Sequence, residues 1–517
     1  MVLAGLVDGI PPIFFLLGTN GSSSGFVLSR KLSPKKFQTV VVSPRSYFVF
    51  TPLLNSTAVG TLEFRTALEP VRSRYKPNVE FMHGRADDVD LNRKMLTVEE
   101  SVVNQRHGHA MTEGLYHSDT ARVANPERQG RRTEGKKWEV SYDKLVVSVG
   151  CYSQTFGTKG VKENAFFQKD IDDARRIRKR ILECFELASL PTASEALRKQ
   201  LLNFAIVGGG PTGMEFGAEL SDLVREDMTK LYPNLAHKVR ITVYDVMPRV
   251  LSMFDENLGK YAMQIFKRQG VRIRTSHHVQ ELRPGLPRRT GEEHLGEIVD
   301  THGCYTLTTE EDGDIGIGIC VWSTGNIMNP FVQRLLEKIR PFPSSSATIL
   351  EKGIDDPTGK DQAWMIEKNS KTGAIVVDDH MRVQLQTKSP EPEEGKQPAR
   401  PTSRAYMQDV FALGDNANVR DLIMPATAQV ASQQALWLGK HLNNETVATQ
   451  KFAFKNLGVM TYLGNWKGLV QTGSGRGLEG YLAWLVWRGA YLTMSVSWRN
   501  KILIPTYWYV VDPQGFC

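Results

Sequence analysis

The chain has 517 residues, of which 41% are hydrophobic and 23% are charged. This composition is typical of a folded globular protein, and it excludes a disordered chain and a membrane protein with many spans. The net charge of +8 is spread along the sequence. No block of Lys and Arg is long enough to indicate nucleic-acid binding, although a basic surface would suit an anionic lipid. A chain of this length predicts two nested domains with appended segments.

Short apolar runs alternate with helical patterns along the chain, which predicts doubly wound α/β layers. Helices are expected at Asp173–Leu187 and Met214–Leu223, and polar insertions at His107–Lys137 and Gln386–Arg404, with a third loop-like region at Pro341–Lys371. The expected strands are Ile13–Leu17, Thr39–Val42, Lys144–Val149, Phe204–Val207, Ile241–Tyr244, Ile319–Trp322 and Val410–Leu413.

The cysteines are widely spaced, and no C-x-x-C pair occurs among them. The spacing gives no support to a zinc site or a thiol–disulfide relay, and no metal site is predicted. Free thiols in a reducing compartment are the expectation. The acidic run Glu310–Asp314 lacks the spacing of a calcium loop and is expected to form an exposed turn. The five cysteines are Cys151, Cys184, Cys304, Cys320 and Cys517.

No segment is long and apolar enough to predict a transmembrane helix. The best candidate, Tyr481–Ser495, is shorter than the roughly 20 residues that a span requires, and it contains Arg488. Met1–Pro12 has the features of neither a mitochondrial presequence nor a secretory signal peptide. The sequence leaves open whether a targeting leader is missing.

The sharpest motif is a glycine-rich turn after the strand expected at Phe204–Val207. It reads Gly208-x-Gly210-x-x-Gly213, and Pro211 stands in the first turn of the helix that follows. In such a turn the first glycine permits the tight bend, the second lets the backbone approach a pyrophosphate, and the third allows close helix–strand packing. The helix N-terminus offers unpaired N–H groups to the phosphates. The motif therefore predicts a dinucleotide site.

The next strand ends in a carboxylate, Asp245, which could accept hydrogen bonds from the adenosine ribose. It follows Gly213 by 32 residues, whereas the usual distance is about 20, so a longer helix and loop must fill the gap. An acid at this position favours NADH over NADPH because it repels a 2′-phosphate, and Arg249 nearby would weaken that preference. The alternative is an ordinary turn residue at the end of a strand.

A second strand, Val410–Leu413, leads into Gly414 and Asp415. The carboxyl ends of parallel strands are where α/β sheets hold ligands. In isolation this is an ordinary strand and turn. Downstream of a nucleotide loop, it resembles the strand of flavoproteins with two dinucleotide-binding domains, whose aspartate holds the ribityl chain of the flavin. Gly150 and Gly325 stand in stretches similar to the two crossovers between the domains of such proteins.

Five further stretches carry a closer resemblance: Ser43–Leu54, Gly60–Glu63, Pro425–Gln434, Trp484–Tyr491 and Trp498–Lys501. With them the chain resembles the type II (alternative, non-proton-pumping) NADH:ubiquinone oxidoreductases of fungal and plant mitochondria. The resemblance runs from about residue 13 to about residue 508, apart from the insertions. It implies non-covalent FAD, NADH and ubiquinone as ligands. It also implies a peripheral position on the mitochondrial inner membrane, on a face that the sequence leaves open.

The fold that the resemblance implies is α/β, with two dinucleotide-binding domains of the glutathione-reductase kind and an amphipathic C-terminal region that anchors the protein to a membrane. We expect the first part of the FAD domain at residues 12–158 and the NADH domain at 159–372. The second part of the FAD domain, with the quinone segment, is expected at 373–446. The anchor and dimerisation region is expected at 447–517.

The resemblance also assigns roles to single residues. Gln429 and Gln433 are expected to contact the quinone. Glu215, two residues past the glycine turn, is expected to order NADH or assist proton delivery, unless it only complements the helix dipole. The expected cofactor-binding residues are Gly18, Gly21, Gly25, Thr51, Pro52, Gly150, Gly208, Gly210, Gly213, Asp245, Gly325, Gly414, Asp415 and Ala428.

The C-terminal tail interleaves aromatic and basic side chains from Gly475 onward. Arg488, Arg499 and Lys501 stand among Trp, Tyr and Leu, a pattern that favours interfacial helices with buried aromatics and outward-reaching basic groups. A core or dimerising helix fits the same pattern, and the family both attaches to membranes and often forms homodimers. The last stretch, Val511–Cys517, departs from the family's usual terminus.

The first glycine loop is irregular. It contains Gly18, Gly21 and Gly25, which do not form G-x-G-x-x-G, although the helix that follows matches the family. Serine hydroxyls in this loop can bond a phosphate in place of glycine N–H groups. Otherwise flavin affinity falls, or the gene model is wrong here. A non-catalytic or weakly flavinylated NADH-binding membrane protein therefore remains an alternative, which the colour of the purified protein would decide.

Several other classes of enzyme share features with this sequence. The stretch Gly21–Gly25 also fits the G-x-S-x-G pattern of serine hydrolases, but His380 and His441 have no supporting pattern as the partner histidine. Disulfide and sulfide:quinone reductases share the fold and require paired cysteines, which this sequence lacks. An NAD(P)H:quinone reductase like the apoptosis-inducing factor differs mainly at the quinone segment and stays open.

Overall fold

The computed structural model describes most of the chain. Gly21 lies outside the described residues, as do most of the two expected insertions and the stretch Val511–Cys517. The described residues are 12–18, 23–72, 79–101, 135–287, 303–351, 363–388, 403–422, 424–495 and 497–508.

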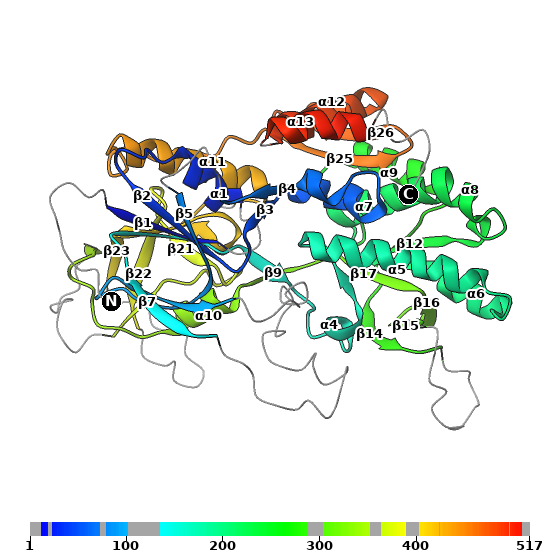
Figure 1. Cartoon of the computed structure of the whole chain (residues 1–517), viewed down its shortest axis with the longest axis horizontal. Helices are drawn as coiled ribbons and strands as arrows, with labels where there is room; N and C mark the ends of the chain where they lie inside the picture. Colours follow the sequence, from blue (N-terminus) through cyan, green and yellow to red (C-terminus); the bar gives the residue numbers. More distant parts are fainter. Residues whose placement is uncertain are drawn as a thin grey trace, which may run out of the picture.

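Within the described residues, a mixed sheet of twelve strands forms the first domain (Figure 1). Its parallel centre runs from β23 through β8 and β1 to β2 and β5. Helices α1 (Ser23–Lys31) and α11 (Ala428–Asn443) pack together beside it. The strand order is β24 (Ala417–Val419), β21 (Ile375–Val377), β22 (Arg382–Thr387), β23 (Arg404–Ala412), β8 (Lys144–Ser148), β1 (Ile13–Gly18), β2 (Gln38–Ser43), β5 (Val79–Asp90), β6 (Met95–Glu100) and β7 (Lys137–Ser141).

The second domain is a five-stranded parallel sheet with helices packed against it. Helix α5 (Ile171–Ser189) begins at a capping box in which Asp170 and Asp173 bond each other's backbone, and α7 (Pro211–Leu223) follows the glycine turn. The sheet order is β10 (Phe166–Phe167), β17 (Ile319–Trp322), β11 (Asn203–Val207), β12 (Arg240–Asp245) and β13 (Arg272–Thr275); a small antiparallel sheet of β14 (Val279–Pro284), β15 (Tyr305–Thr309) and β16 (Gly313–Ile317) lies beside it.

Two antiparallel strands connect the domains. Strand β9 (Cys151–Ser153) leaves the first domain and pairs with β18 (Asn326–Met328), which returns from the second. The two stretches expected to be crossovers therefore lie side by side. A buried ion pair between Arg45 of the first domain and Asp170 at the start of α5 also joins the domains.

The domain boundary expected at residue 372 lies too late in the chain. Strand β19 (Ala347–Glu351) pairs with β23, and β20 (Trp364–Ile366) pairs with β22, so both belong to the large sheet. The chain has already returned to the first domain at β18. The region 341–371 was expected to be a loop because these strands are short, and their pairing partners lie far away in the sequence.

The C-terminal residues form a compact module against α7. Three antiparallel strands, β25 (Val459–Gly464), β26 (Lys467–Gln471) and β27 (Gly477–Gly480), precede α12 (Tyr481–Met494) and α13 (Trp498–Thr506). In Figure 1 this module, in orange and red, lies over α7. Among the described residues, no helix has both the length and the apolar character needed to cross a membrane.

The expected strands and helices are confirmed to within a few residues at most ends. The largest difference is β23, which begins six residues before the expected Val410. Its first part, Arg404–Asp409, contains polar residues, so it does not form the continuous apolar run by which the strand was predicted. The run Glu310–Asp314 forms a turn between β15 and β16, as expected.

Replacing Gly213 by Ala is expected to destabilise the second domain by about 1–3 kcal/mol, because an added methyl group overpacks the turn. That methyl would collide with the carbonyl oxygen of Gly208 and the hydroxyl of Ser323. The control is Gly259→Ala in α9 (Glu256–Arg268), where the methyl meets no atom within 4 Å and should stabilise by about 0.4–1 kcal/mol. Denaturant unfolding of both variants measures the difference; equal stabilities would contradict the close packing.

Candidate functional site

A cavity of about 450 Å³ opens where the two domains, the connecting strands and the C-terminal module meet. Its volume falls within the range of small-molecule and cofactor sites, roughly 300–1,000 Å³. Both the N-terminus of α7, which follows the turn after β11, and the turn after β23 contribute to its wall. Eight of the residues expected from the sequence line it: Thr51, Pro52, Gly150, Glu215, Gly325, Gly414, Asp415 and Ala428.

The glycine turn after β11 has the geometry of a dinucleotide site. Gly208 adopts a φ of +117°, which L side chains rarely adopt. A Cβ on Gly210 would meet no protein atom within 4 Å, so the backbone is open to a ligand there. Gly213 is tightly packed against the turn. Pro211 and Thr212, at the N-terminus of α7, line the cavity and direct the positive end of the helix toward it.

Asp245 lies beside this turn, at the end of β12. Its Oδ2 accepts a hydrogen bond from the backbone N–H of Gly209, and its Oδ1 accepts one from Met247 at 2.7 Å. The carboxylate is partly exposed and does not line the cavity itself. It therefore fixes the turn and keeps part of its surface open to a nucleotide.

The first glycine loop joins β1 to α1. Gly18 ends β1 and lines a small adjacent cavity, and Gly25 lies in α1. Ser24, at the start of this helix, lines the main cavity. The binding of a phosphate by serine hydroxyls of this loop stays a prediction.

Two amide side chains brace the other ligand-facing turns. Gln434 Oε1 accepts a hydrogen bond from the Gly414 N–H at 2.8 Å, and Asn416 Oδ1 accepts one from the Gly150 N–H at 3.0 Å. Both amides are fully buried. They hold Gly414 and Gly150 facing the cavity, and the sequence analysis missed them. The signal was available for Gln434, which shares a helix face with Ala428 and Ala431.

The cavity wall also carries buried polar atoms that fit a polar, planar cofactor. Asn55 Oδ1 and both amide atoms of Gln168 have no hydrogen-bond partner within the described part of the chain, and both residues line the cavity. Lys169 lines it too and donates to Asn326 Oδ1 at 2.8 Å. Unpaired buried polar atoms are costly, so we expect a bound ligand to supply their missing hydrogen-bond partners. A flavin ring carries donors and acceptors of this kind. None of the three residues stands in a motif that the sequence could reveal.

Glu215 is buried at the wall of the cavity and receives hydrogen bonds from three separate parts of the chain. The Tyr462 backbone N–H donates to Oε1 at 3.1 Å and Trp487 Nε1 donates to it at 3.3 Å, while Asn55 Nδ2 donates to Oε2 at 3.2 Å. Burial raises the pKa of Glu215 to about 7, and these hydrogen bonds oppose the rise. The side chain can therefore exchange a proton near neutral pH.

Gln429 and Gln433 do not line the cavity. Gln429 bonds the backbone of Leu457 and Gly458, at 3.0 and 3.3 Å. Gln433 bonds both backbone atoms of Lys455, at 3.0 and 2.8 Å. The two amides thus hold the segment that leads into β25, and their expected contact with the quinone stays a prediction. Helical geometry explains why neither lines the cavity: the cavity face of α11 carries Ala428 and Ala431, while the two glutamines face the strap formed by residues 455–458.

Two basic side chains of the C-terminal module are also placed differently from the expectation. Arg488 packs over the rings of Trp484 and Trp508, with its Cζ 4.3 and 4.6 Å from the two ring centroids. Arg499 donates to the carbonyls of Arg65 and Leu68. Both guanidinium groups contact the protein itself, because aromatic rings and backbone carbonyls lie within their reach.

The four cysteines within the described residues are buried, and none of the four forms a disulfide. Cys151 lines the cavity, and burial raises its pKa to about 12. A thiol in that state is a poor nucleophile. This part of the chain therefore offers no redox-active thiol pair to the cavity.

The sequence and the structure are similar to those of known flavin oxidoreductases. The pyridine nucleotide-disulphide oxidoreductase family matches residues 20–337. A probable NADH dehydrogenase of Dictyostelium discoideum is 35% identical over 95% of this chain and 88% of its own. The mitochondrial internal alternative NAD(P)H-ubiquinone oxidoreductase A1 of Arabidopsis thaliana is 30% identical over 98% and 85%. The NDH2 structure of Plasmodium falciparum with NADH matches with a TM-score of 0.72 at 18% identity, covering 98% and 99%.

These matches define a two-domain nucleotide-binding oxidoreductase. The chain belongs to the pyridine nucleotide-disulphide oxidoreductase family and, within it, to the type II or alternative NADH dehydrogenases.

Replacing Gln433 by Leu tests the clamp against the expected quinone contact. Loss of its two hydrogen bonds to Lys455 is expected to lower stability by about 1–3 kcal/mol and to loosen residues 455–458, which hydrogen exchange would detect. The KM for a short-chain quinone should change little. The control is Lys440→Gln, at an exposed position near the end of α11. A raised KM with normal stability would instead restore the quinone assignment.

Proposed function

We propose that this chain catalyses the oxidation of NADH by ubiquinone, with FAD as its non-covalent redox cofactor and without proton pumping. The observation that carries the proposal is the shared cavity, which receives the N-terminus of α7, the Gly414–Asp415 turn and the buried carboxyl of Glu215. The names of the curated relatives agree with this reaction. An NADH-dependent reduction of a short-chain ubiquinone by the purified, yellow protein is the direct test.

The residues divide the reaction between the two domains. We assign residues 12–158 and 326–446 to FAD and residues 159–325 to NADH. The Gly208–Gly213 turn and Asp245 would hold NADH, and the turns at Gly150 and Gly414 with Asp415 would hold FAD. The bound flavin supplies the hydride-accepting chemistry. The chain supplies position, a cavity screened from water and, at Glu215, a carboxyl that can carry a proton.

The alternatives weighed from the sequence are less well supported. A non-catalytic NADH-binding protein would not need the polar wall formed by Asn55, Gln168 and Lys169 on the flavin side of the cavity. His380 is bonded to Asp379 at 2.6 Å and His441 to Thr446 at 2.7 Å. Neither histidine lines the cavity, so a serine hydrolase gains no support.

We further propose that the C-terminal module attaches the protein to the mitochondrial inner membrane. Helices α12 and α13 bury one face against the body of the protein and expose apolar side chains on the other. The relatives named as mitochondrial support the compartment; the homodimer stays a prediction, which mass measurement in detergent would check. The exposed apolar residues are Tyr481, Leu482, Leu485, Val486, Met494, Trp498 and Ile502.

The Asp245→Asn variant is expected to use NADH less well. The amide can accept only one of the two bonds from the backbone N–H groups of Gly209 and Met247, because its NH₂ group faces the other donor. The substitution also removes the negative charge that repels a 2′-phosphate. Loss of one charge-assisted bond is worth about 1.5–3 kcal/mol, so kcat/KM for NADH should fall roughly 10- to 100-fold. The NADH/NADPH ratio should fall with it. An unchanged ratio would remove Asp245 from the nucleotide site.

The double variant Trp498→Ser and Ile502→Gln is expected to weaken membrane attachment and leave the cavity intact. These side chains are 80% and 65% exposed, and burying such a group in lipid contributes about 1.5–3 kcal/mol each. Co-sedimentation with anionic vesicles measures the loss. Reduction of a soluble quinone should remain normal. Undiminished sedimentation would place the anchor elsewhere. A truncation before Gly475 is unsuitable, because it would uncover Glu215.

A further inference from the structure

A row of three buried acids runs along one face of α7. Glu215, Glu219 and Asp222 are separated by four and three residues, and this spacing puts them on the same face of a helix. Each is at least 90% buried. A helix face with three buried carboxyls is costly to maintain, so the row needs a physical reason.

The row connects two cavities. Glu215 lines the main cavity, while Glu219 and Asp222 line a second cavity of about 110 Å³. The second cavity lies between α7 and the C-terminal helices, with Trp484 and Trp487 in its wall. Half-exposed acids stand at its edge: Glu63, Glu226 and Asp227. The acids therefore lead from the ligand cavity toward solvent.

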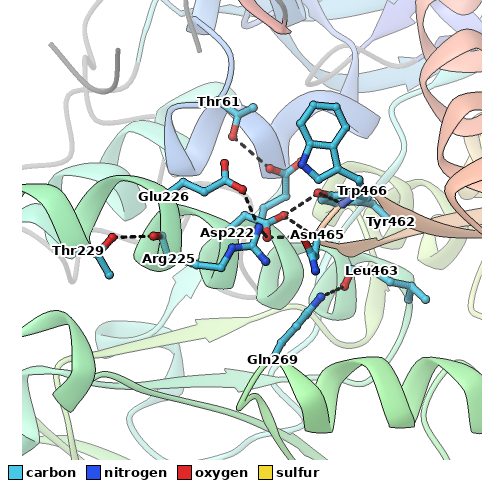
Figure 2. A network of polar contacts seen from close by, with 11 residues as sticks. Thr61, Asp222, Arg225, Glu226, Thr229, Gln269, Tyr462, Leu463, Asn465 and Trp466 are labelled. Atoms are coloured by element: carbon cyan, nitrogen blue, oxygen red, sulfur yellow. Dashed lines mark hydrogen bonds and ion pairs between the residues drawn. The ribbon is translucent and has the colours of Figure 1, made fainter. Parts of the chain in front are cut away.

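Hydrogen-bond donors from the first domain and the C-terminal module surround the three acids. Ser56 Oγ and Thr61 Oγ1 donate to the two oxygens of Glu219 at 2.6 and 3.1 Å. Tyr462 donates its backbone N–H to Glu215 and its hydroxyl to Asp222 Oδ2 at 2.6 Å. Figure 2 shows Thr61, Tyr462 and Asp222 in this network. Hydroxyls both donate and accept hydrogen bonds, so those of Ser56 and Thr61 can exchange a proton with Glu219, and that of Tyr462 with Asp222.

The surroundings keep these acids near their titration points. Burial raises the pKa of Glu219 to about 7, with Asp222 adding to the rise, and Ser56, Thr61 and the Arg488 guanidinium opposing it. Burial raises the pKa of Asp222 to about 6, against the bonds from Tyr462 and Asn465 and the charge of Arg225. Glu226 adds to the latter rise. Both acids can take up and release a proton at neutral pH.

An unsatisfied group at the inner end of the row faces the ligand cavity. Asn55 donates to Glu215 through Nδ2, but its Oδ1 has no partner among the described residues and the side chain is 95% buried. This acceptor lies in the cavity wall beside the first acid. It indicates that the cavity binds a ligand carrying a proton donor at this point, and both a flavin ring and a quinol carry such donors.

The proposed reaction requires a proton at the same place. NADH transfers a hydride, two electrons and one proton, and becomes NAD⁺. A quinone that receives the equivalent of this hydride still needs one proton to become the neutral quinol. That proton must come from water. On the side of Glu215, α7 packs against α2 (Leu54–Val59) and β25, so a proton arriving from this side has to pass along the packed face of α7.

We propose that Asp222 and Glu219 form a proton relay that supplies Glu215, and through it the quinone, from the second cavity. This inference rests on the proposed quinone reduction. Asp222 and Glu219 are relay residues that act through Glu215; neither lines the main cavity. The relay also assigns a role to the C-terminal module, because Tyr462 holds both ends of the row.

The test compares two electron acceptors in the purified holoenzyme. Ferricyanide takes electrons alone and needs no proton, whereas a short-chain ubiquinone needs protons. Glu219→Gln should lower kcat with quinone by at least about tenfold, a modest part of what proton transfer can contribute, and should leave kcat with ferricyanide within about twofold. Asp222→Asn should act in the same direction, and Glu219→Asp should restore part of the rate. Glu256→Gln, an exposed acid on α9, is the control.

The pH profile separates a relay from a structural role. An acid that supplies protons works while it is protonated, so wild-type kcat with quinone should fall as pH rises through about 7, the pKa of Glu219. In Glu219→Gln this fall should disappear, and the solvent deuterium isotope effect should change. Equal losses with both acceptors, or an unchanged profile in Glu219→Gln, would overturn the relay. A wild-type protein that reduces neither acceptor would overturn the proposed function instead.

Discussion

The burial of the Glu215 carboxyl is the constraint on which the site depends. A buried carboxyl is tolerated only when hydrogen-bond donors replace water, and here the donors come from residues 55, 462 and 487. The first lies in α2, the second in β25 and the third in α12. These three segments can meet only when the first domain, the second domain and the C-terminal module are all assembled. The hydrogen bonds of the Glu215 carboxyl therefore depend on all three parts of the molecule being in place.

This dependence changes the meaning of the C-terminal region. It resembles a membrane anchor by composition, yet one face of it completes the wall around Glu215, Glu219 and Asp222. The amides of Gln429 and Gln433 hold the strap that leads into it. The glutamines thus reach the chemistry indirectly, by fixing residues 455–458 and so the position of Tyr462. The opposite face of the module carries the exposed apolar side chains that we propose to contact the membrane.

Much of the fold could be predicted from the sequence, because strand and helix signals are local. The apolar runs, the glycine turn at Gly208–Gly213 and the Gly414–Asp415 turn are all visible within a few residues, and eight expected residues line the cavity. The boundary at residue 372 could not be found, since β19 and β20 are defined by partners about 20 to 60 residues away. The roles of Asn55 and Gln168 depend on tertiary contacts that leave no local pattern. The backbone bonds of Gln433 could not be predicted either, because they depend on which face of α11 meets residues 455–458.

The most direct test of the account is to follow the flavin of the purified protein as NADH and quinone are added in turn without oxygen. The account predicts a yellow protein whose flavin absorbance is bleached by NADH in the absence of quinone and restored when a short-chain ubiquinone is added. Bleaching without restoration would contradict quinone reduction at this site. A protein that carries no flavin after reconstitution with FAD would contradict the assignment of the cavity itself.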